Sequence, residues 1–228
     1  MPQFEMPGLR ADNPQGWMAA IGLLSVLDQQ GKVAQLSWQQ LIPTLYGVEY
    51  EEVIQTLLSY LQEGSQALDR LESLPKDPEK NKIALDFTAG RVNFTDVIDS
   101  MTKTVTMNDI THSLTQPWNN TADEVSLGWD PFAVKQAATL SGNNAPDSAK
   151  HRTELGGQWL AAESLAITSP PPSSLRGEFK WVTWRVPLDL EGVYSVVQAQ
   201  SEAWLGIRYS AKIGFSGSFK FFLPAVRL

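Results

Sequence analysis

The feature that most constrains the fold is an almost uninterrupted apolar stretch near the N-terminus. Between residues 17 and 27 only Ser25 is strongly polar. The stretch follows Asp12-Asn13-Pro14, which combines a helix-capping side chain with a proline at the first helical position, where its missing N–H does no harm. The pattern predicts a helix over residues 14–30 that ends at Gly31. Because this helix lacks a polar face, we expect it to be buried on all sides.

Gly22 lies in the middle of this predicted helix, where glycine costs roughly 1 kcal/mol relative to alanine. A glycine at such a position indicates that another backbone packs closely against the helix. The apolar stretch is about half the length of ~20 residues that a membrane-spanning helix needs, so we expect no membrane segment. Residues 1–5 show no basic region leading into an apolar run, and we expect no secretion signal.

Cysteine is absent from the 228 residues, which removes disulfides, thiolate zinc sites, iron–sulfur clusters and cysteine nucleophiles together. A reducing compartment suits such a chain, and we expect a cytoplasmic protein. Hydrophobic residues make up 43% of the chain and charged residues 19%, so there is enough apolar surface to offset the entropy of ordering a core. The length fits a single domain over residues 1–228 or two lobes joined by the charged, proline-marked loop 75–82.

Periodicity and turn signals predict the remaining elements. Helices are expected over residues 49–74 with a break at Gly64-Ser65, over 92–103, from Asp109 to just before Pro117, over 132–139 after a second cap-and-proline signal at Asp130-Pro131, over 154–165 and over 190–200. Strands are expected over residues 33–38, 83–87, 125–129, 178–186 and 204–215. We therefore predict an α+β fold. A mixed, largely antiparallel sheet, formed mainly by the second half of the chain and residues 83–87, should pack around the buried helix.

The sequence offers little support for catalysis. The two histidines, His112 and His151, lack the His-x-x-x-His or Glu-x-x-His spacing that would place two metal ligands on one helical face. No nucleophile elbow, phosphate-binding loop or dinucleotide fingerprint occurs. We expect no catalytic residue, no bound metal and no cofactor.

One acidic pattern keeps an enzymatic alternative open. Pro146-Asp147 is followed 31 residues later by Glu178-Phe179-Lys180, which resembles the Pro-Asp…Glu-x-Lys pattern of magnesium-dependent nucleases. In such a site two carboxylates would hold the metal and the lysine would position the attacking water. The pattern is short, and Asp147 lies in the loop-like, Gly/Asn-rich segment 141–148, where a ligand is hard to hold rigidly. In the structural alternative, Glu178 and Lys180 decorate one face of a strand.

Charge is divided unevenly along the chain. The formal net charge is −7, which argues against a chain that coats nucleic acid with its whole surface. Residues 1–148 carry nine Lys and Arg against nineteen Asp and Glu, whereas residues 149–228 carry nine against six. From Ala203 onward there are four cations and no acid. Any contact with a polyanion should therefore involve the C-terminal segment.

That segment interleaves cations with aromatic residues around a glycine-containing stretch at residues 214–220, which we expect to be a small, flexible loop. Phosphate oxygens accept hydrogen bonds from lysine side chains and from the backbone N–H groups of glycine-containing turns, and bases stack on exposed aromatic rings. The candidate nucleic-acid-binding residues are Arg208, Lys212, Phe215, Phe219, Lys220 and Arg227. In the alternative interpretation the segment is a terminal hairpin, whose aromatics fill the core and whose cations are merely solvated.

Several separated phrases are similar, in their order, to CRISPR-associated subunits of the type I-G (formerly I-U) systems, and the match spans nearly the whole chain. The phrases are Gly16-Trp17-Met18-Ala19-Ala20-Ile21-Gly22-Leu23-Leu24, Leu85-Asp86-Phe87-Thr88-Ala89-Gly90, Gly128-Trp129-Asp130-Pro131, Trp159-Leu160-Ala161, Trp184-Arg185-Val186-Pro187-Leu188 and residues 219–225.

The resemblance implies a non-enzymatic component of an RNA-guided surveillance complex in antiviral defence, in which guide pairing reads the sequence and protein subunits hold backbones and one another. The implied partners are other effector subunits and guide RNA or target DNA. The matching phrases contribute no catalytic residue. Because the chain is acidic overall, its first half could instead dock onto a basic neighbouring subunit. A protein-binding adaptor that uses the acidic half and residues 169–174 remains a third alternative.

Overall fold

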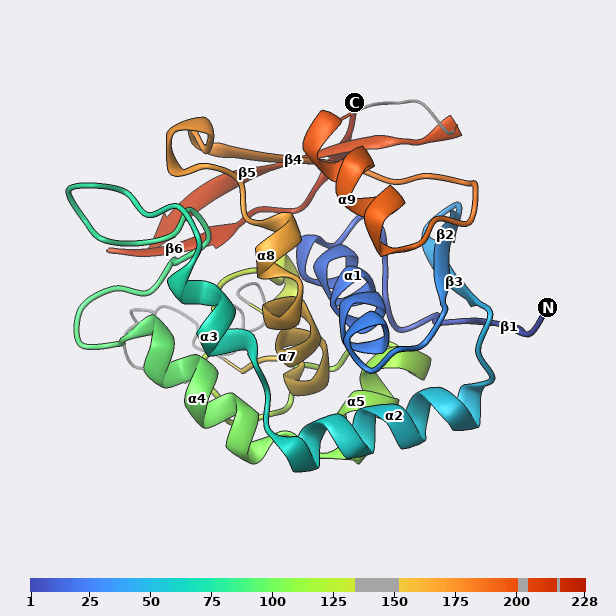
Figure 1. Ribbon diagram of the computed structural model, residues 1–228. Coiled ribbons are helices and arrows are strands. Elements are labelled where there is room, and N and C mark those ends of the chain that lie inside the picture. Colours follow the sequence, from blue (N-terminus) through green and yellow to red (C-terminus); the bar gives the residue numbers. More distant parts are fainter. Residues whose placement is uncertain (134–151, 201–204, 217) are drawn as a thin grey trace.

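Helix α1 (Pro14–Gln29) occupies the centre of the computed structural model, which describes residues 1–133, 152–200, 205–216 and 218–228 (Figure 1). Asn13 caps this helix, because its Oδ1 accepts hydrogen bonds from the backbone N–H groups of Gln15 and Gly16 at 3.0 and 3.4 Å. Every residue from Pro14 through Leu27 is buried. The predicted helix is therefore confirmed, and so is its burial except at the last two residues, Asp28 and Gln29, which are exposed.

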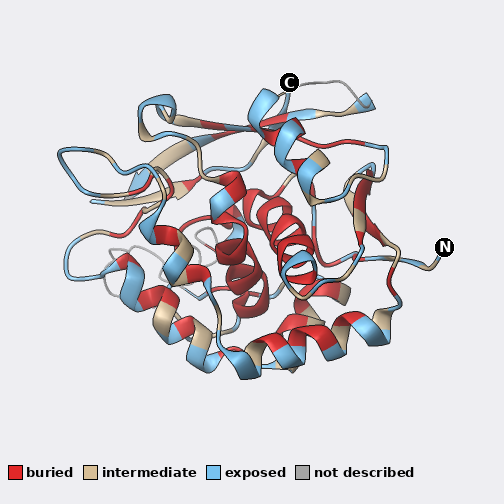
Figure 2. Cartoon of the chain, viewed as in Figure 1, coloured by how far each residue is buried: buried red, intermediate tan, exposed pale blue. Residues whose placement is uncertain are grey.

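Helix α7 (Leu155–Glu163) packs directly against α1, and both helices are buried along their length in Figure 2. The contact is closest at Gly22, where an added Cβ would lie 1.7 Å from the backbone oxygen of Leu160. No side chain larger than hydrogen fits there without displacing α7. This confirms that Gly22 marks a close backbone approach.

A first antiparallel sheet contains β1 (Gln3–Glu5), β2 (Gln35–Gln39) and β3 (Ile42–Tyr46), in the order β1-β3-β2. Its β2 edge is covered by residues 184–188, which follow the first strand of the second sheet. Leu36 and Leu188 exchange backbone hydrogen bonds of 2.8 and 3.0 Å, and the Trp38 N–H donates to Trp184 O at 2.8 Å. The two sheets are thereby tied together through a short extended segment.

The second sheet consists of β4 (Glu178–Val182), β5 (Arg208–Ser216), β6 (Phe219–Phe222) and β7 (Val226–Arg227). All its pairings are antiparallel, in the order β4-β5-β6, with β7 also bonded to β5. The ring of Trp17 on α1 lies 6.1 Å from Phe179 and 6.3 Å from Trp181 on β4. An α+β fold with antiparallel sheets against the buried helix is therefore confirmed.

The remaining helices surround α1 and α7. They are α2 (Tyr50–Glu63), α3 (Ala67–Glu72), α4 (Phe94–Thr104), α5 (Met107–Thr115), α8 (Leu165–Thr168), the 3₁₀ helix η2 (Pro172–Ser174) and α9 (Leu190–Ala199). Helices α2, α4 and α5 lie on the side opposite the second sheet (Figure 1). The predicted break at Gly64-Ser65 is confirmed. The cap of α5 is Thr106, not Asp109, because Asp109 is the third helical residue of a capping box.

Two predicted strands are wrong, and both lie beside the second sheet without joining its ladder. Residues 83–87 contain a turn and residues 125–129 lack strand geometry. Phe87 O accepts only one backbone hydrogen bond from β6, from Lys220 N at 3.4 Å, and Leu85 O accepts from the Trp129 indole at 3.0 Å. In residues 83–87 the alternating apolar side chains are buried as the pattern required, but the cause is packing beside a sheet edge. In residues 125–129 Leu127 and Trp129 are buried, whereas Val125 is exposed.

The expected flexible loop at residues 214–220 is also wrong, because β5 extends through Ser216 and β6 begins at Phe219. The expected mobile loop 141–148 and most of the expected helix 132–139 lie outside the described residues. Within the described chain, no helix combines the length and apolarity needed to cross a bilayer.

Candidate nucleic-acid interface

The pairing register of the second sheet separates the six candidate residues into two sets of three. Side chains alternate along a strand, and residues directly opposite one another in an antiparallel pair share a face. The face turned away from α1, called the outer face below, carries Glu178, Lys180, Arg208, Ser210, Lys212, Phe219 and Phe221. The inner face carries the core aromatics and, at its ends, Phe215, Lys220 and Arg227. The six residues therefore do not form one surface.

Three exposed cations meet on the outer face. Lys180 lies opposite Ser210 on β5, so that Arg208 and Lys212 flank it diagonally on the same side of the sheet. Such diagonal neighbours are separated by about 7–8 Å, within reach of long side chains. The Arg208 guanidinium donates to Gln200 O at 3.0 Å, which fixes it at the edge of this face. The outer face thus offers a short row of positive charges at the surface.

Glu178 is the carboxylate in this group, and it is already engaged. Its Oε1 accepts a short hydrogen bond from the Ser210 hydroxyl, and its Oε2 lies 3.2 Å from Lys180 Nζ. The hydrogen bond from Ser210, followed by that from Lys180, holds the pKa of Glu178 below its usual value. The side chain is consequently ionised at neutral pH, where it offsets one of three positive charges.

The same contacts bear on the nuclease alternative. Glu178 and Lys180 decorate one face of a strand, as in the structural alternative, and Asp147 lies outside the described residues. In the part of the chain that the structure describes, no three His, Cys, Asp or Glu residues are grouped so as to hold a metal ion.

Two phenylalanines extend the outer face beyond the cations. The rings of Phe219 and Phe221 stack at 6.4 Å between centroids with an interplanar angle of 25°. Phe221 covers Gly214, where an added Cβ would lie 2.8 Å from the ring. Both phenylalanines are half-buried, so part of each ring contacts solvent. Stacked aromatic rings of this kind can hold bases of a single strand.

Phe215 and Lys220 lie together at one end of the inner face. Phe215 is 65% exposed, and both residues line a small cleft of about 190 Å³ with Asp77, Lys80 and Lys82 from the loop 75–82. In the structure this loop lies beside the end of the sheet, where its side chains line the cleft. Its charges are mixed, so the cleft does not form a positive surface.

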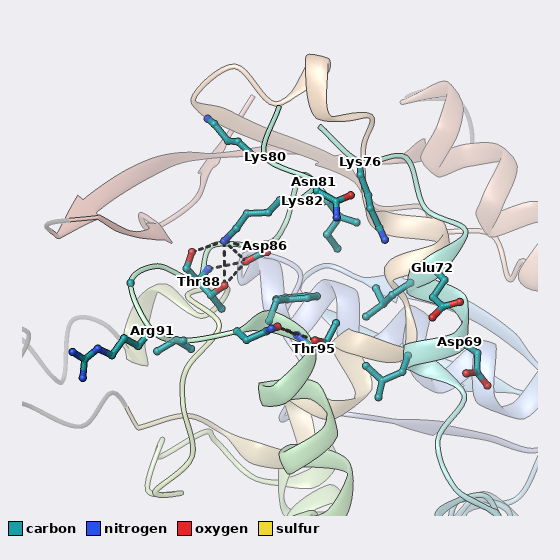
Figure 3. Close-up of a pocket in the computed structure, with 17 residues that line it drawn as sticks. Asp69, Glu72, Lys76, Lys80, Asn81, Lys82, Asp86, Thr88, Arg91 and Thr95 are labelled. Atoms are coloured by element: carbon teal, nitrogen blue, oxygen red, sulfur yellow. Dashed lines mark hydrogen bonds and ion pairs between the residues drawn. The ribbon is translucent and has the colours of Figure 1, made fainter. Parts of the chain in front are cut away.

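A larger cleft of about 830 Å³ adjoins it, between α3 and the start of α4 (Figure 3). Lys82 is held inside the wall, because its Nζ donates to Thr88 O at 2.9 Å and lies 3.3 Å from Asp86 Oδ2. Asp69 and Glu72 of α3 form the opposite wall (Figure 3). Acidic and basic groups alternate around this cleft, which makes it a weaker candidate for a polyanion than the outer face.

Two residues of the outer face, Lys180 and Phe221, were not among the candidates predicted from sequence. Lys180 was considered for a metal site or as a side chain on one face of a strand, and Phe221 was not singled out. The alternation Glu178-Phe179-Lys180 already indicated that Lys180 points away from the core. What the sequence lacked was the register that places Lys180 beside Arg208 and Lys212.

No protein-family model matches the sequence, and no curated protein matches it either. The basis for a function is therefore the geometry of the outer face together with the ordered phrases described for the sequence.

Proposed function

We propose that this chain is a non-enzymatic, cytoplasmic subunit of an RNA-guided CRISPR effector complex, and that its outer face contacts the backbone of guide RNA or target DNA. The observation that carries the nucleic-acid contact is the cluster of Lys180, Arg208 and Lys212 on one solvent-facing side of the sheet, beside the stacked Phe219 and Phe221. The order of the sequence phrases supports the type of complex. Antiviral defence follows from that assignment.

The geometry favours a short single-stranded segment as the bound species. Each of the three cations can contact a phosphate, although Glu178 offsets part of their charge. Stacking on an aromatic ring requires bases that are free of a partner strand. For single strands the logarithm of the binding constant falls with the logarithm of salt concentration by about 0.7 per phosphate contacted. We therefore expect a slope of about −2 in a plot of the logarithm of the binding constant against the logarithm of salt concentration. Such a slope is a modest electrostatic contribution to affinity, which suits one subunit among several.

The test is a pair of charge substitutions with a matched control. We expect Lys180→Gln combined with Lys212→Gln to weaken binding of single-stranded RNA, measured by fluorescence anisotropy, and to reduce the salt slope by about 1.4. Lys103→Gln on α4 removes an exposed lysine from the opposite side of the molecule, where it pairs only with Asp99 at 2.6 Å. This control should leave both affinity and slope nearly unchanged.

Two results would contradict the proposed contact. One is binding that does not depend on salt, and the other is an equal loss in the control and the outer-face variant. A chain that binds no nucleic acid but still assembles with protein partners would instead favour the adaptor.

A further inference from the structure

A third pocket lies at the opposite end of the inner face from Phe215, with a volume of about 560 Å³. It is formed where β7 and the start of β5 meet the segment after β4 and the β2–β3 turn. Its charged and aromatic lining consists of Asp12, Arg185, Tyr209 and Arg227, and Leu41 and Ile207 contribute apolar surface. The pocket faces away from the outer face and shares none of the residues that define it.

The positive charge of this pocket is not neutralised by its surroundings. Arg185 and Arg227 are both exposed, and neither guanidinium makes a hydrogen bond or ion pair with the described residues. Asp12 supplies a negative charge, but Arg10 binds both of its carboxylate oxygens, at 2.9 and 2.8 Å. Two guanidinium groups are therefore left for a ligand.

Tyr209 provides a third donor. Its ring is buried, with only 4% of the residue exposed, and stacks on Trp181 at 5.7 Å. Burial, followed by the charge of Asp12, raises the pKa of the Tyr209 hydroxyl, so this group is protonated at neutral pH. It makes no hydrogen bond within the described part of the chain, and it is not among the side-chain atoms that are sealed from solvent, so it can reach a ligand in the pocket.

We propose that this pocket binds the phosphate group of a phosphomonoester, through the forked guanidinium groups of Arg185 and Arg227 and the hydroxyl of Tyr209. Guanidinium groups match phosphate oxygens in pairs, which fixes the orientation of the bound group as well as its charge. A monoester carries about −1.5 to −2 charges at neutral pH, which balances two unpaired arginines better than the single charge of a chain-internal diester. The apolar surface of Leu41 and Ile207 would contact the organic part of the ligand.

Two sources share this chemistry, a free nucleoside monophosphate and the 5′-phosphorylated end of a nucleic-acid strand. Adenosine monophosphate, adenosine, and a short oligonucleotide with either a 5′-phosphate or a 5′-hydroxyl are the probes, and titration calorimetry measures their affinity. We expect the phosphorylated form of each pair to bind more tightly. A larger phosphate effect in the oligonucleotide pair identifies the strand end as the source, and a larger effect in the nucleoside pair identifies the free nucleotide.

Substitutions separate the three donors. Tyr209→Phe retains the stacked ring and removes only the hydroxyl, so we expect about a tenfold loss of affinity for the monophosphate. Arg185→Gln should cost at least as much, and because Arg185 is exposed this variant does not depend on the core for folding. Arg91→Gln, an exposed arginine in the other large cleft, is the matched control and should retain the wild-type affinity.

The proposal is overturned if neither phosphorylated probe binds more tightly than its unphosphorylated partner, or if Arg185→Gln binds as tightly as the wild type. It is also overturned if the control loses as much affinity as Arg185→Gln. Failure here leaves the outer face untouched, since Lys180 and Lys212 are tested on a different face of the sheet with a different readout.

Discussion

At the scale of single residues, a hydrogen bond between two short polar side chains joins two segments that are far apart in the sequence. Asn13, which caps α1, also donates from its Nδ2 to Asp130 Oδ1 at 3.0 Å. Asp130 accepts from the Phe132 N–H at 2.9 Å, so it caps the following turn in the same way. The sequence predicted both caps separately, because each follows a local rule. It could not predict that one cap holds the other.

Asp130 is fully buried, and its second oxygen, Oδ2, has no hydrogen-bond partner. Burial raises the pKa of Asp130, although hydrogen bonds from Phe132 and from the side chains of Asn120 and Asn13 oppose the shift. A carboxyl whose pKa is higher in the folded than in the unfolded chain binds its proton more tightly when folded. Its contribution to stability is therefore present below the unfolded pKa and is lost as pH rises through the folded pKa.

Asp130→Asn should remove this pH dependence while keeping the oxygen that accepts from Asn13. We expect the free energy of unfolding of the variant, relative to the wild type, to increase as pH rises above the ordinary aspartate pKa of about 3.9. Urea unfolding at several pH values measures the difference. Asp130→Ala serves as the contrast. It leaves the buried Asn13 amide without its hydrogen-bond acceptor and should lower the free energy of unfolding by about 1–3 kcal/mol. A difference between Asp130→Asn and wild type that is constant with pH would contradict this account.

At the scale of elements, the contact between α1 and α7 decides how closely the two buried helices approach. An alanine at position 22 gains about 1 kcal/mol of helix propensity, but its Cβ would overlap Leu160 O. Overpacking of a rigid backbone contact typically costs 1–3 kcal/mol and sometimes more. We therefore expect Gly22→Ala to lower the free energy of unfolding by about 1–3 kcal/mol, measured by urea unfolding.

Gly192 on α9 is the matched control, because its added Cβ would meet flexible side-chain atoms at 3.2 Å and no backbone. Gly192→Ala should be nearly neutral. If Gly22→Ala proved as stable as Gly192→Ala, the close packing of α1 on α7 would not be a determinant of stability.

The elements that could be predicted from sequence are those specified by local signals. The cap at Asn13, the apolar stretch that follows it and the break at Gly64-Ser65 all depend on neighbours in the chain. The failure at residues 83–87 has a physical cause, since burial beside a sheet edge produces the same alternation as strand pairing. The prediction of the candidate site was wrong in part for a related reason. Whether Lys212 and Lys220 share a face depends on where the β5–β6 hairpin turns, and reading residues 214–220 as a loop left that undetermined.

At the scale of the whole molecule, the uneven charge of the sequence becomes a separation in space. Helices α2, α3 and α4 carry exposed acids. Of these helices, α2 and α4 lie on the side opposite the second sheet, which carries the outer-face cations (Figure 1). The exposed acids on these helices are Glu51, Glu52, Glu63, Asp69, Glu72 and Asp96. One of these acids, Glu52, pairs with Lys32 at 2.8 Å. Lys103 and Arg70 do not offset the others, because they pair with Asp99 and with the buried Glu163. A molecule of this kind can contact a polyanion with one side and a basic protein with the other.

This arrangement predicts that protein assembly and nucleic-acid contact are separable. If the acidic helices dock onto a basic subunit of the proposed complex, Glu51→Lys combined with Glu63→Lys should weaken co-elution with that subunit after nuclease treatment, and the remaining association should fall further with salt. The outer-face variant, with Lys180 and Lys212 replaced by glutamine, should co-elute as the wild type does while its binding to RNA is weakened. The opposite result, in which the sheet substitutions abolish assembly and the helix substitutions do not, would place the protein interface on the sheet. The cations of the outer face would then bind an acidic partner subunit, and this face would no longer be available to nucleic acid.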